Sequence, residues 1–501
     1  MGAVRVTRAA ITPGALLPLS GASDTMAGMS LPPQFDEPAF RGLQRIDAVL
    51  DRGQTRVFRV LWFMLPAGSV ARKPQFQALL ASRFLSDIAI QALLYGALIA
   101  TVRGGGTAVD AALVGVAYLL PGVVLALYGG ALADAMPKRV ALVGAYLAMG
   151  LLCFVIAGAF GTGFRSLLLV IVCVRALHQL SQPSEASALP LVATREELAA
   201  ATSFLSFASS AGEVAGKALL APVLVRAWGV NPVIGLAGLL FILSSSRVLK
   251  LQMAEGDVRK GGRESLDAAR RQFSTRVALQ YLLGQPGILW MLLLAAMAST
   301  VNVVLGVLGP QYVQSVLHVD PSNAVYVFAP APIGLVVALV LAPLLIDSLG
   351  ERVIAAVGFG LVAVAGTGLG VVDWLVGQLG WLLVLDLPGI SEQVELAALL
   401  SVLLGAGMTL AAAAAQTFVT RNVPLEIQGR TNALLGMLKD GLAIPSLLLL
   451  GAVAGLVGVR AVIAVAPGLL LVAALAVDRY STRWRSLPAA NRFIERSSFS
   501  R

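Results

Sequence analysis

Long runs of apolar residues, separated by short polar segments, form the main pattern along this chain. Twelve of these runs come close to or exceed the ~20 residues that an α-helix needs to cross a bilayer, so they predict twelve transmembrane helices. The predicted spans are residues 77–102, 108–132, 139–160, 164–188, 199–224, 228–250, 285–311, 322–347, 352–373, 397–420, 430–455 and 459–478. They divide into six and six around residues 255–276, the most polar interior segment.

This division predicts an all-α membrane protein made of two six-helix bundles. The expected parts are a cytoplasmic N-terminal tail (1–76) with an interfacial segment at 57–70, a first bundle (77–250), a cytoplasmic linker (251–284), a second bundle (285–478) and a basic cytoplasmic tail (479–501). Residues 1–28 leave three alternatives open: a tail without fixed structure, a targeting segment, or a leader that a start at Met26 or Met29 would omit.

Composition and charge support the membrane assignment. Only 13% of the residues are charged, against about 25% in soluble proteins, and the mean hydropathy is +0.84. The net charge of +10 comes from basic residues in loops and tails, so no nucleic-acid partner is expected. With the N-terminus inside, the inside segments hold 29 Lys and Arg residues and the outside loops hold 4. This asymmetry predicts a multi-pass protein of the plasma (inner) membrane with both termini in the cytoplasm.

Polar residues inside the predicted spans are the candidate functional groups, because each is unfavourable in hydrocarbon. Three spans carry them at helical spacing: Arg83, Asp87 and Gln91 in the first, Arg175, His178, Gln182 and Glu185 in the fourth, and Ser206, Ser210, Glu213 and Lys217 in the fifth. An arginine near mid-span costs about 2.5–3.5 kcal/mol, so Arg175 should face water or a carboxylate, for which Asp87 is the best candidate. Together these stripes predict a substrate or proton pathway, in which His178 would titrate between about pH 5 and 8.

Structural explanations remain open for the charged pairs. Adjacent groups of opposite charge can staple two helices together or simply neutralise each other. The pairs concerned are Arg83 with Asp87, Glu213 with Lys217, and Lys439 with Asp440, the last of which we interpret as structural.

The segment GGALADAMPKR (129–139) follows the second span and resembles the loop signature of the major facilitator superfamily, G-x-L-A-D-R-x-G-R-K/R. The matching positions are Gly130, Leu132, Ala133, Asp134, Lys138 and Arg139, whereas Ala135 and Pro137 depart from the signature. The second half repeats the pattern in PLLIDSLGER (343–352), where Gly350 takes the Pro137 place. Asp347 and Arg352 each follow their counterparts by 213 residues (347 − 134, 352 − 139).

The resemblance covers residues 77–478 and implies a central cavity between the two bundles, lined by the first, fourth, seventh and tenth spans. It also implies that the two loops act as conformational gates, whose residues are Gly130, Asp134, Lys138, Arg139, Asp347, Gly350 and Arg352. We expect Asp134 and Asp347 to lie near basic groups or a helix N-terminus and to stabilise the outward-facing state.

Further segments refine the resemblance. VRALHQL (174–180) is similar to the fourth-span pattern R-x-x-Q-G of proton-coupled members, with Arg175 in the Arg place and His178 in the Gln place. GEVAGKALLA (212–221) keeps only Gly212 and Gly216 of the antiporter signature, and Lys217 replaces its proline, which weakens the case for antiport. Residues 181–203 resemble the same stretch of macrolide, siderophore and lysophospholipid transporters, and favour an exporter-like branch.

These patterns predict a monomeric secondary active transporter that exports an amphipathic drug-, siderophore- or lipid-like molecule, coupled to protons or another ion. Its expected partners are that molecule and the lipid bilayer. The alternative is a transporter-like sensor or membrane partner protein, which the departures at Ala135, Pro137 and Lys217 keep open. The sequence has no phosphate-binding loop, no Cys/His cluster at metal spacing and no recognisable catalytic nucleophile, so no enzymatic activity, cofactor or metal is expected.

Overall fold

The computed structural model describes residues 70–135, 137–160, 163–194, 197–251, 285–379, 391–423, 425–469 and 471–472. The regular structure of these residues is entirely helical, and eleven of their helices are long and apolar enough to cross a membrane. The predicted all-α membrane fold is therefore confirmed. The interfacial segment before residue 70, nearly all of the expected linker and the C-terminal tail lie outside the described residues.

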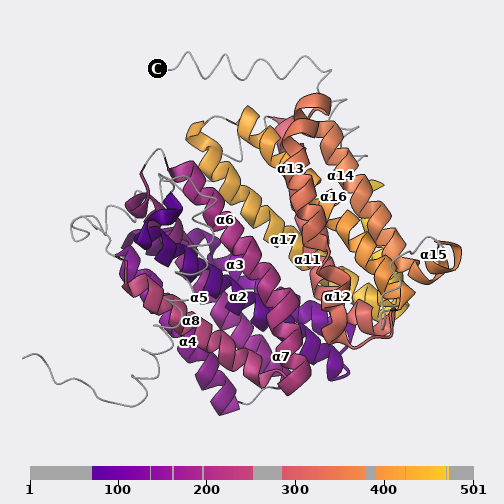
Figure 1. Ribbon diagram of the computed structural model, residues 1–501, viewed down its shortest axis with the longest axis horizontal. Helices are drawn as coiled ribbons and strands as arrows, with labels where there is room; N and C mark the ends of the chain where they lie inside the picture. Colours follow the sequence, from indigo (N-terminus) through magenta and orange to yellow (C-terminus); the bar gives the residue numbers. More distant parts are fainter. Residues whose placement is uncertain are drawn as a thin grey trace, which may run out of the picture. The chain divides into compact units, whose positions relative to one another are not determined.

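The helices of the first half follow the predicted spans closely (Figure 1). A 3-10 turn, η1 (Val70–Arg72), leads into α2 (Pro74–Arg103), whose 30 residues reach about 45 Å at 1.5 Å per residue. Pro74 occupies the first turn of α2, where its missing N–H has no intrahelical partner to lose. The others are α3 (Ala108–Ala135), α4 (Lys138–Phe160), α5 (Phe164–Val192), the continuous run of α6 (Leu198–Val214), η2 (Ala215–Leu220) and α7 (Ala221–Trp228), and α8 (Asn231–Leu249).

The second half departs from the prediction at the eighth span, which was expected at 322–347. The structure instead places two short elements first, and the spanning helix begins only at Ala331. Pro330 and Pro332 explain the break, because proline cannot donate a backbone hydrogen bond to the preceding turn. The elements are α11 (Pro286–Ser315), η4 (Pro321–Asn323), α12 (Ala324–Phe328), α13 (Ala331–Leu349), α14 (Glu351–Gly370), α15 (Val372–Leu379), α16 (Glu392–Asn422), α17 (Leu425–Val457) and a helix at Val459–Leu469.

The helices of each half pack mainly on one another. In the first half α2 contacts α6 and α8, while α4 contacts α5 and α8; in the second half α16 contacts α13 and α14, while α11 contacts α16 and α17. The two halves meet along α3 and α17. Small residues line this seam, since a Cβ atom at Gly115 would meet Val307 and Leu447, and one at Gly451 would meet Ala112. Such residues allow close approach of helix backbones in a membrane.

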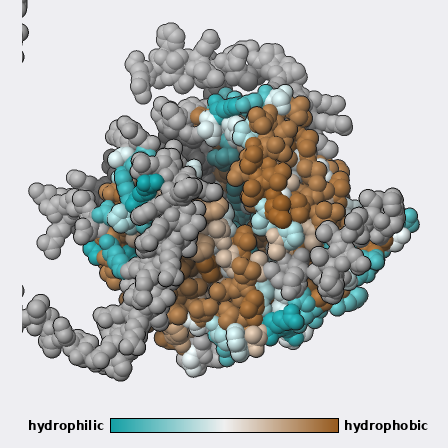
Figure 2. Space-filling view, in the orientation of Figure 1, coloured by the Kyte–Doolittle hydropathy of each residue, from teal (hydrophilic) through white to brown (hydrophobic). Residues whose placement is uncertain are grey.

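The outward face of the second half is apolar. On α13, Val340 and Leu344 are 67% and 69% exposed, and Figure 2 shows a brown hydrophobic surface over this helix. A soluble protein rarely exposes an apolar surface of this extent, so lipid contact explains it.

Candidate functional site

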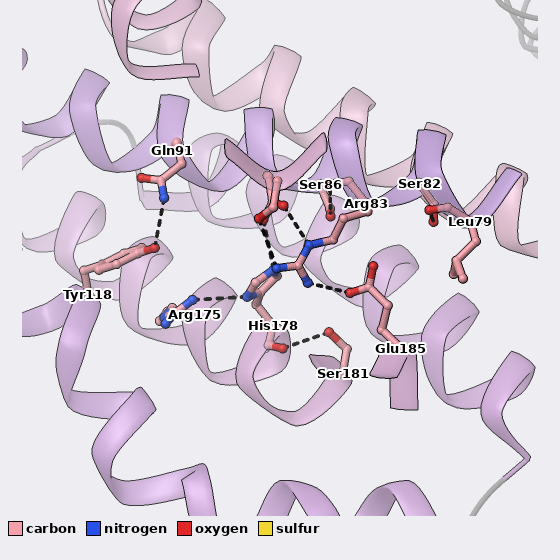
Figure 3. Close-up of polar contacts among 12 residues, drawn as sticks. Leu79, Ser82, Arg83, Ser86, Gln91, Tyr118, Arg175, His178, Ser181 and Glu185 are labelled. Carbon is pink, nitrogen blue, oxygen red and sulfur yellow. Dashed lines mark hydrogen bonds and ion pairs between the residues drawn. The ribbon is translucent and has the colours of Figure 1, made fainter. Parts of the chain in front are cut away.

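Charged side chains from α2 and α5 are buried together in the first half, with Arg83 between them (Figure 3). Arg83 Nε lies 2.8 Å from Asp87 Oδ2, one turn further along α2, and Arg83 Nη1 donates to Glu185 Oε2 on α5 at 2.6 Å. Arg83 Nη2 donates to Ser209 Oγ on α6 at 3.2 Å. Asp87 and Glu185 are only 5% and 4% exposed, so one guanidinium group faces two buried carboxylates from two helices.

His178 of α5 lies beside these groups and is 2% exposed. Its Nδ1 is 3.2 Å from Arg175 Nη1, and its Nε2 is 3.9 Å from Asp87 Oδ1. A guanidinium group only donates hydrogen bonds, so Nδ1 must be the acceptor and the neutral ring carries its proton on Nε2, toward Asp87. Protonation of Nδ1 would break the bond to Arg175. The charge of His178 is therefore tied to the position of Arg175.

Arg175 lies over an aromatic ring rather than pairing with Asp87. Its guanidinium carbon lies 4.6 Å from the ring centroid of Tyr118 on α3, a favourable cation–π arrangement. The Tyr118 hydroxyl accepts a hydrogen bond of 3.4 Å from Gln91 Nε2 of α2. The expected Arg175–Asp87 pair is thus not formed, because Asp87 stands four residues after Arg83 on the same helix and faces that arginine instead.

Several buried polar atoms of this region have no hydrogen-bond partner. Nearly all buried polar atoms in proteins are paired with protein groups or water, so such a concentration calls for an explanation. A water molecule, a proton or a polar ligand held among these groups would satisfy them. They include Gln91 Oε1, Arg175 Nε, His178 Nε2, Ser184 Oγ and Glu185 Oε1. Gln182, also in the predicted stripe, is partly buried on the same helix α5.

The fifth-span pair lies at an irregularity of the helix. Residues Ala215–Leu220 form a π-helical turn, a feature often found at functional positions. Lys217 Nζ donates to Glu213 Oε1 at 2.5 Å, so this pair does satisfy its own charges, as the structural alternative proposed. Gly212 and Gly216 let the turn approach α2 closely, because a Cβ at Gly216 would lie 2.6 Å from the Ile88 carbonyl oxygen.

Comparison with known proteins identifies the family. Residues 79–443, more than half of the chain, match the Major Facilitator Superfamily. The chain belongs to this superfamily. The comparison with curated proteins finds no match to the chain.

Solved structures of this superfamily fold resemble the chain at low sequence identity. The nucleoside transporter NupG is 12% identical with a TM-score of 0.60, and the match covers 81% of this chain and 98% of NupG. A bacterial homologue of the iron transporter ferroportin, in an inward-facing state, is 18% identical with a TM-score of 0.59, covering 81% and 98%. The peptide transporter POT is 15% identical with a TM-score of 0.60, covering 81% and 94%. These likenesses establish a transporter fold, and the chain is a multi-pass membrane protein.

The superfamily loop of the second half is ordered around Asp347. Its Oδ1 accepts from Arg421 Nη2 at 2.9 Å, while Glu351 Oε1 accepts from Arg421 Nη1 at 2.8 Å. Gly350 joins α13 to α14 with a φ of 85°, a conformation that favours glycine. Arg352 lies 5.9 Å from the Phe418 ring. All these contacts stay within the second half, so among the described residues Asp347 has no ion-pair or hydrogen-bond partner in the first half.

The corresponding loop of the first half is described only in part. Gly130 and Asp134 belong to α3, but their side chains lie outside the described residues. Lys138 opens α4, and Arg139 donates a hydrogen bond to the carbonyl oxygen of Leu249 at the end of α8. The gating role of these four residues remains a prediction.

A nearby turn links the start of α2 to the start of α6. Glu197 accepts hydrogen bonds from Lys73 Nζ at 2.6 Å and from the backbone N and hydroxyl of Thr194 at 2.9 and 2.8 Å. The Lys73 bond first, and then those of Thr194, lower the pKa of Glu197 to about 2. The pair lies at the surface, so it positions the turn more than it stabilises the fold.

Sequence reasoning missed a contact between the two halves at the opposite end of the molecule. Arg103, at the end of α2, donates to both carboxylate oxygens of Asp320 at 2.7 and 2.8 Å and to the Val225 carbonyl oxygen at 2.8 Å. Arg226 of α7 donates to Asn323 Oδ1 at 2.9 Å. We call these four side chains, Arg103, Asp320, Arg226 and Asn323, the latch. The scarcity of basic residues in the outside loops was the only signal in the sequence that singled out Arg103 and Arg226.

Asp320 stays charged over the physiological range. Partial burial alone would raise the pKa of Asp320, but hydrogen bonds from Ser322 and then Arg103 outweigh it and hold this pKa below its usual range. A carboxyl group with a lowered folded-state pKa contributes its stabilisation above its unfolded pKa and loses it only as the pH falls toward the folded value. The latch is therefore intact at neutral pH.

Proposed function

We propose that this protein is a secondary active transporter that moves an amphipathic small molecule across the membrane by alternating access. The carrying observation is the buried charged group around Arg83, whose partnerless polar atoms come from α2 and α5. These helices are the first and fourth spans, which line the central cavity in the superfamily. The residues assigned to the pathway are Arg83, Asp87, Gln91, Arg175, His178, Gln182, Glu185, Glu213 and Lys217.

The unequal polarity of the two halves supports an amphipathic substrate. The first half contributes the charged groups described above, whereas α16, the tenth span, is built largely of Ala, Leu and Gly, with Gln416 as the main polar group of the predicted span. The similar structures are named as transporters of nucleosides, of iron and of peptides, so the fold itself does not select the substrate. The drug-, siderophore- or lipid-like class and the export direction rest on the resemblance of residues 181–203 to exporter-like members.

Proton coupling is supported by the arrangement of titratable groups. Asp87, Glu185 and His178 lie within one buried group. The two acids, Asp87 and Glu185, both pair with Arg83, and His178 lies beside Asp87. A proton taken up by either acid would weaken its hold on Arg83, and this would change how α2 and α5 are tied. Such a change is the type of two-state event that couples ion binding to transport.

The proposal is tested by flux measurements in proteoliposomes with an imposed pH gradient. A macrolide, a siderophore and a lysophospholipid represent the expected class, and a nucleoside and a dipeptide serve as polar controls. Gradient-dependent movement of one of the first three is expected. Binding without any movement would favour the alternative, a transporter-like sensor.

Topology provides an independent prediction. Both termini and the segment 251–284 should be cytoplasmic in the plasma membrane, because of the asymmetry of basic residues. Fluorescent and phosphatase reporters fused after Gly262 and after Arg501 should show the cytoplasmic signal at both points. A periplasmic or extracellular signal at either fusion would contradict the orientation.

The latch gives a second prediction about conformation. In the proposed orientation it closes the outer face, so Asp320→Asn should shift the equilibrium toward the outward-facing state by about 1 kcal/mol, or about fivefold. Spin labels at Val109→Cys and Leu456→Cys, where the ends of α3 and α17 meet, should report a larger population of long distances. Asp373→Asn is the matched control, since Asp373 pairs with Arg460 inside the second half. Equal distance distributions in wild type and Asp320→Asn would count against the latch.

A further inference from the structure

Asp440 of α17 reaches across the seam between the two halves. Gly122 of α3 provides the space, because a Cβ atom there would lie 2.7 Å from Asp440 Oδ2 and 3.8 Å from Gln179 Oε1 of α5. Gln179 follows Arg175 by four residues on α5, so the Asp440 carboxylate lies on the side of α5 that carries Arg175, within electrostatic range of its guanidinium group. The two groups are not in ion-pair contact in this structure. A second-half carboxylate thus lies near, but not on, a first-half guanidinium group.

Arg175 has N–H groups that lack a hydrogen-bond acceptor among the described residues. Its only hydrogen bond in the described part of the chain runs from Nη1 to the His178 ring, and its buried Nε has no partner. Arg83, by contrast, contacts two carboxylates and a serine hydroxyl. An arginine in a membrane span without a bound carboxylate is unfavourable, so Arg175 lacks the anionic partner that would stabilise it within the described helices.

The free part of Arg175 has the shape that binds anions. Nε and Nη2 form one edge of the guanidinium plane, and two parallel N–H groups on such an edge bind carboxylate or phosphate oxygens in a bidentate manner. The guanidinium carbon lies over the Tyr118 ring and Nη1 is bonded to His178, so these two neighbours restrict the orientation of the free edge. Groups that fix an arginine in advance reduce the entropy lost when an anion binds.

We propose that the Nε–Nη2 edge of Arg175 binds the anionic group of the transported molecule, a carboxylate or a phosphate, and that Asp440 competes for the same guanidinium. The inference rests on the proposed transport function and names the charge of its substrate. When the site is empty, Asp440 partly neutralises Arg175 across the α3–α17 seam. When the anion binds, Asp440 is displaced, and one attraction that holds the two halves together is weakened. Binding is in this way linked to the movement that transport requires.

The test uses the purified full-length protein and a matched set of small amphipathic probes. The set consists of phenylbutyrate, its neutral amide phenylbutanamide, phenylbutyl phosphate and phenylbutylamine, whose apolar parts are the same. Apparent dissociation constants come from the ligand-dependent rise in melting temperature. Wild type should bind the carboxylate or the phosphate about 10–100 times more tightly than the amide, the range expected for hydrogen bonds to a charged group. The two anions distinguish a carboxylate site from a phosphate site.

Three variants separate this role from a structural one. Asp440→Asn should tighten anion binding about tenfold and leave amide binding unchanged, because it removes the competitor. Arg175→Gln should abolish the anion preference, and Arg175→Lys, which keeps the charge but not the fork, should retain only part of it. Asp110→Asn changes a surface carboxylate at the start of α3, the helix that carries Gly122, and should leave all four dissociation constants unchanged.

The outcomes are distinct. Weaker or unchanged anion binding in Asp440→Asn, or a full anion preference in Arg175→Lys and Arg175→Gln, would overturn the proposal. Equal binding of the amide and the anions by wild type would overturn the anion site but leave the transport function standing. If none of the four probes stabilised wild type, both the anion site and the amphipathic substrate class would fall.

Discussion

Replacing Arg83 with glutamine is expected to lower the stability of the protein by about 3–5 kcal/mol, the usual cost of leaving buried charges without their partner. Asp87 and Glu185 both face this one guanidinium, at 2.8 and 2.6 Å, and both are almost inaccessible to solvent. The stability of Arg83→Lys should fall between those of wild type and Arg83→Gln, because an ammonium group cannot contact both carboxylates with the geometry of the guanidinium fork.

Cys153 offers an internal reporter for this measurement, since it is fully buried in α4. In a Cys173→Ser background, a thiol-reactive fluorophore should label Cys153 only upon unfolding, and Arg83→Gln should melt at a clearly lower temperature. The triple variant Arg83→Gln, Asp87→Asn, Glu185→Gln removes all three charges and should recover most of the loss. If the triple variant melts as low as the single one, the effect of Arg83 comes from packing and not from charge.

Glu185→Gln should separate transport from its driving force. Glutamine resembles a permanently protonated Glu185 and can still accept the bond from Arg83 Nη1, so the protein should fold. Uphill transport driven by a pH gradient should fall about tenfold or more. Glutamine cannot take up and release a proton, so the bond to Arg83 no longer changes in strength during the transport cycle. Exchange of labelled for unlabelled substrate at equal pH, which needs no net proton movement, should continue.

This pair of measurements distinguishes coupling from a general defect. Asp373→Asn, a surface carboxylate paired with Arg460, should leave both activities at the wild-type level. If Glu185→Gln still concentrates substrate as wild type does, Glu185 does not carry the coupling proton. If it loses exchange as well, Glu185 acts in substrate binding or in the conformational change itself.

The sequence was a good guide wherever a property depends on residues close together in the chain. Hydrophobic runs gave the spans because crossing the bilayer demands about 20 apolar residues in succession, whatever the rest of the chain does. Helical periodicity likewise predicted that Arg83 and Asp87 share a face and pair, and that Glu213 reaches Lys217. The predicted start of the eighth span, residue 322, was wrong, because Pro330 and Pro332 interrupt the helix and α13 begins only at Ala331.

Contacts between helices could not be obtained in the same way. The sequence placed Arg175 opposite Asp87, whereas the structure places it over the Tyr118 ring and brings Asp440 of the other half within electrostatic range. The latch joins Arg103 to Asp320, 217 residues later, through two loops with no shared motif.

The sequence by itself therefore determined the membrane class, the spans, the repeated loop pattern and which polar residues share a helix face. Only the tertiary structure decided which of those faces meet, that Arg83 serves two acids at once, and that Gly122 admits Asp440 to the neighbourhood of Arg175. The physical reason is that helix periodicity is set by local backbone hydrogen bonds. Which helices cross, and at what depth, depends instead on the packing of side chains far apart in the chain.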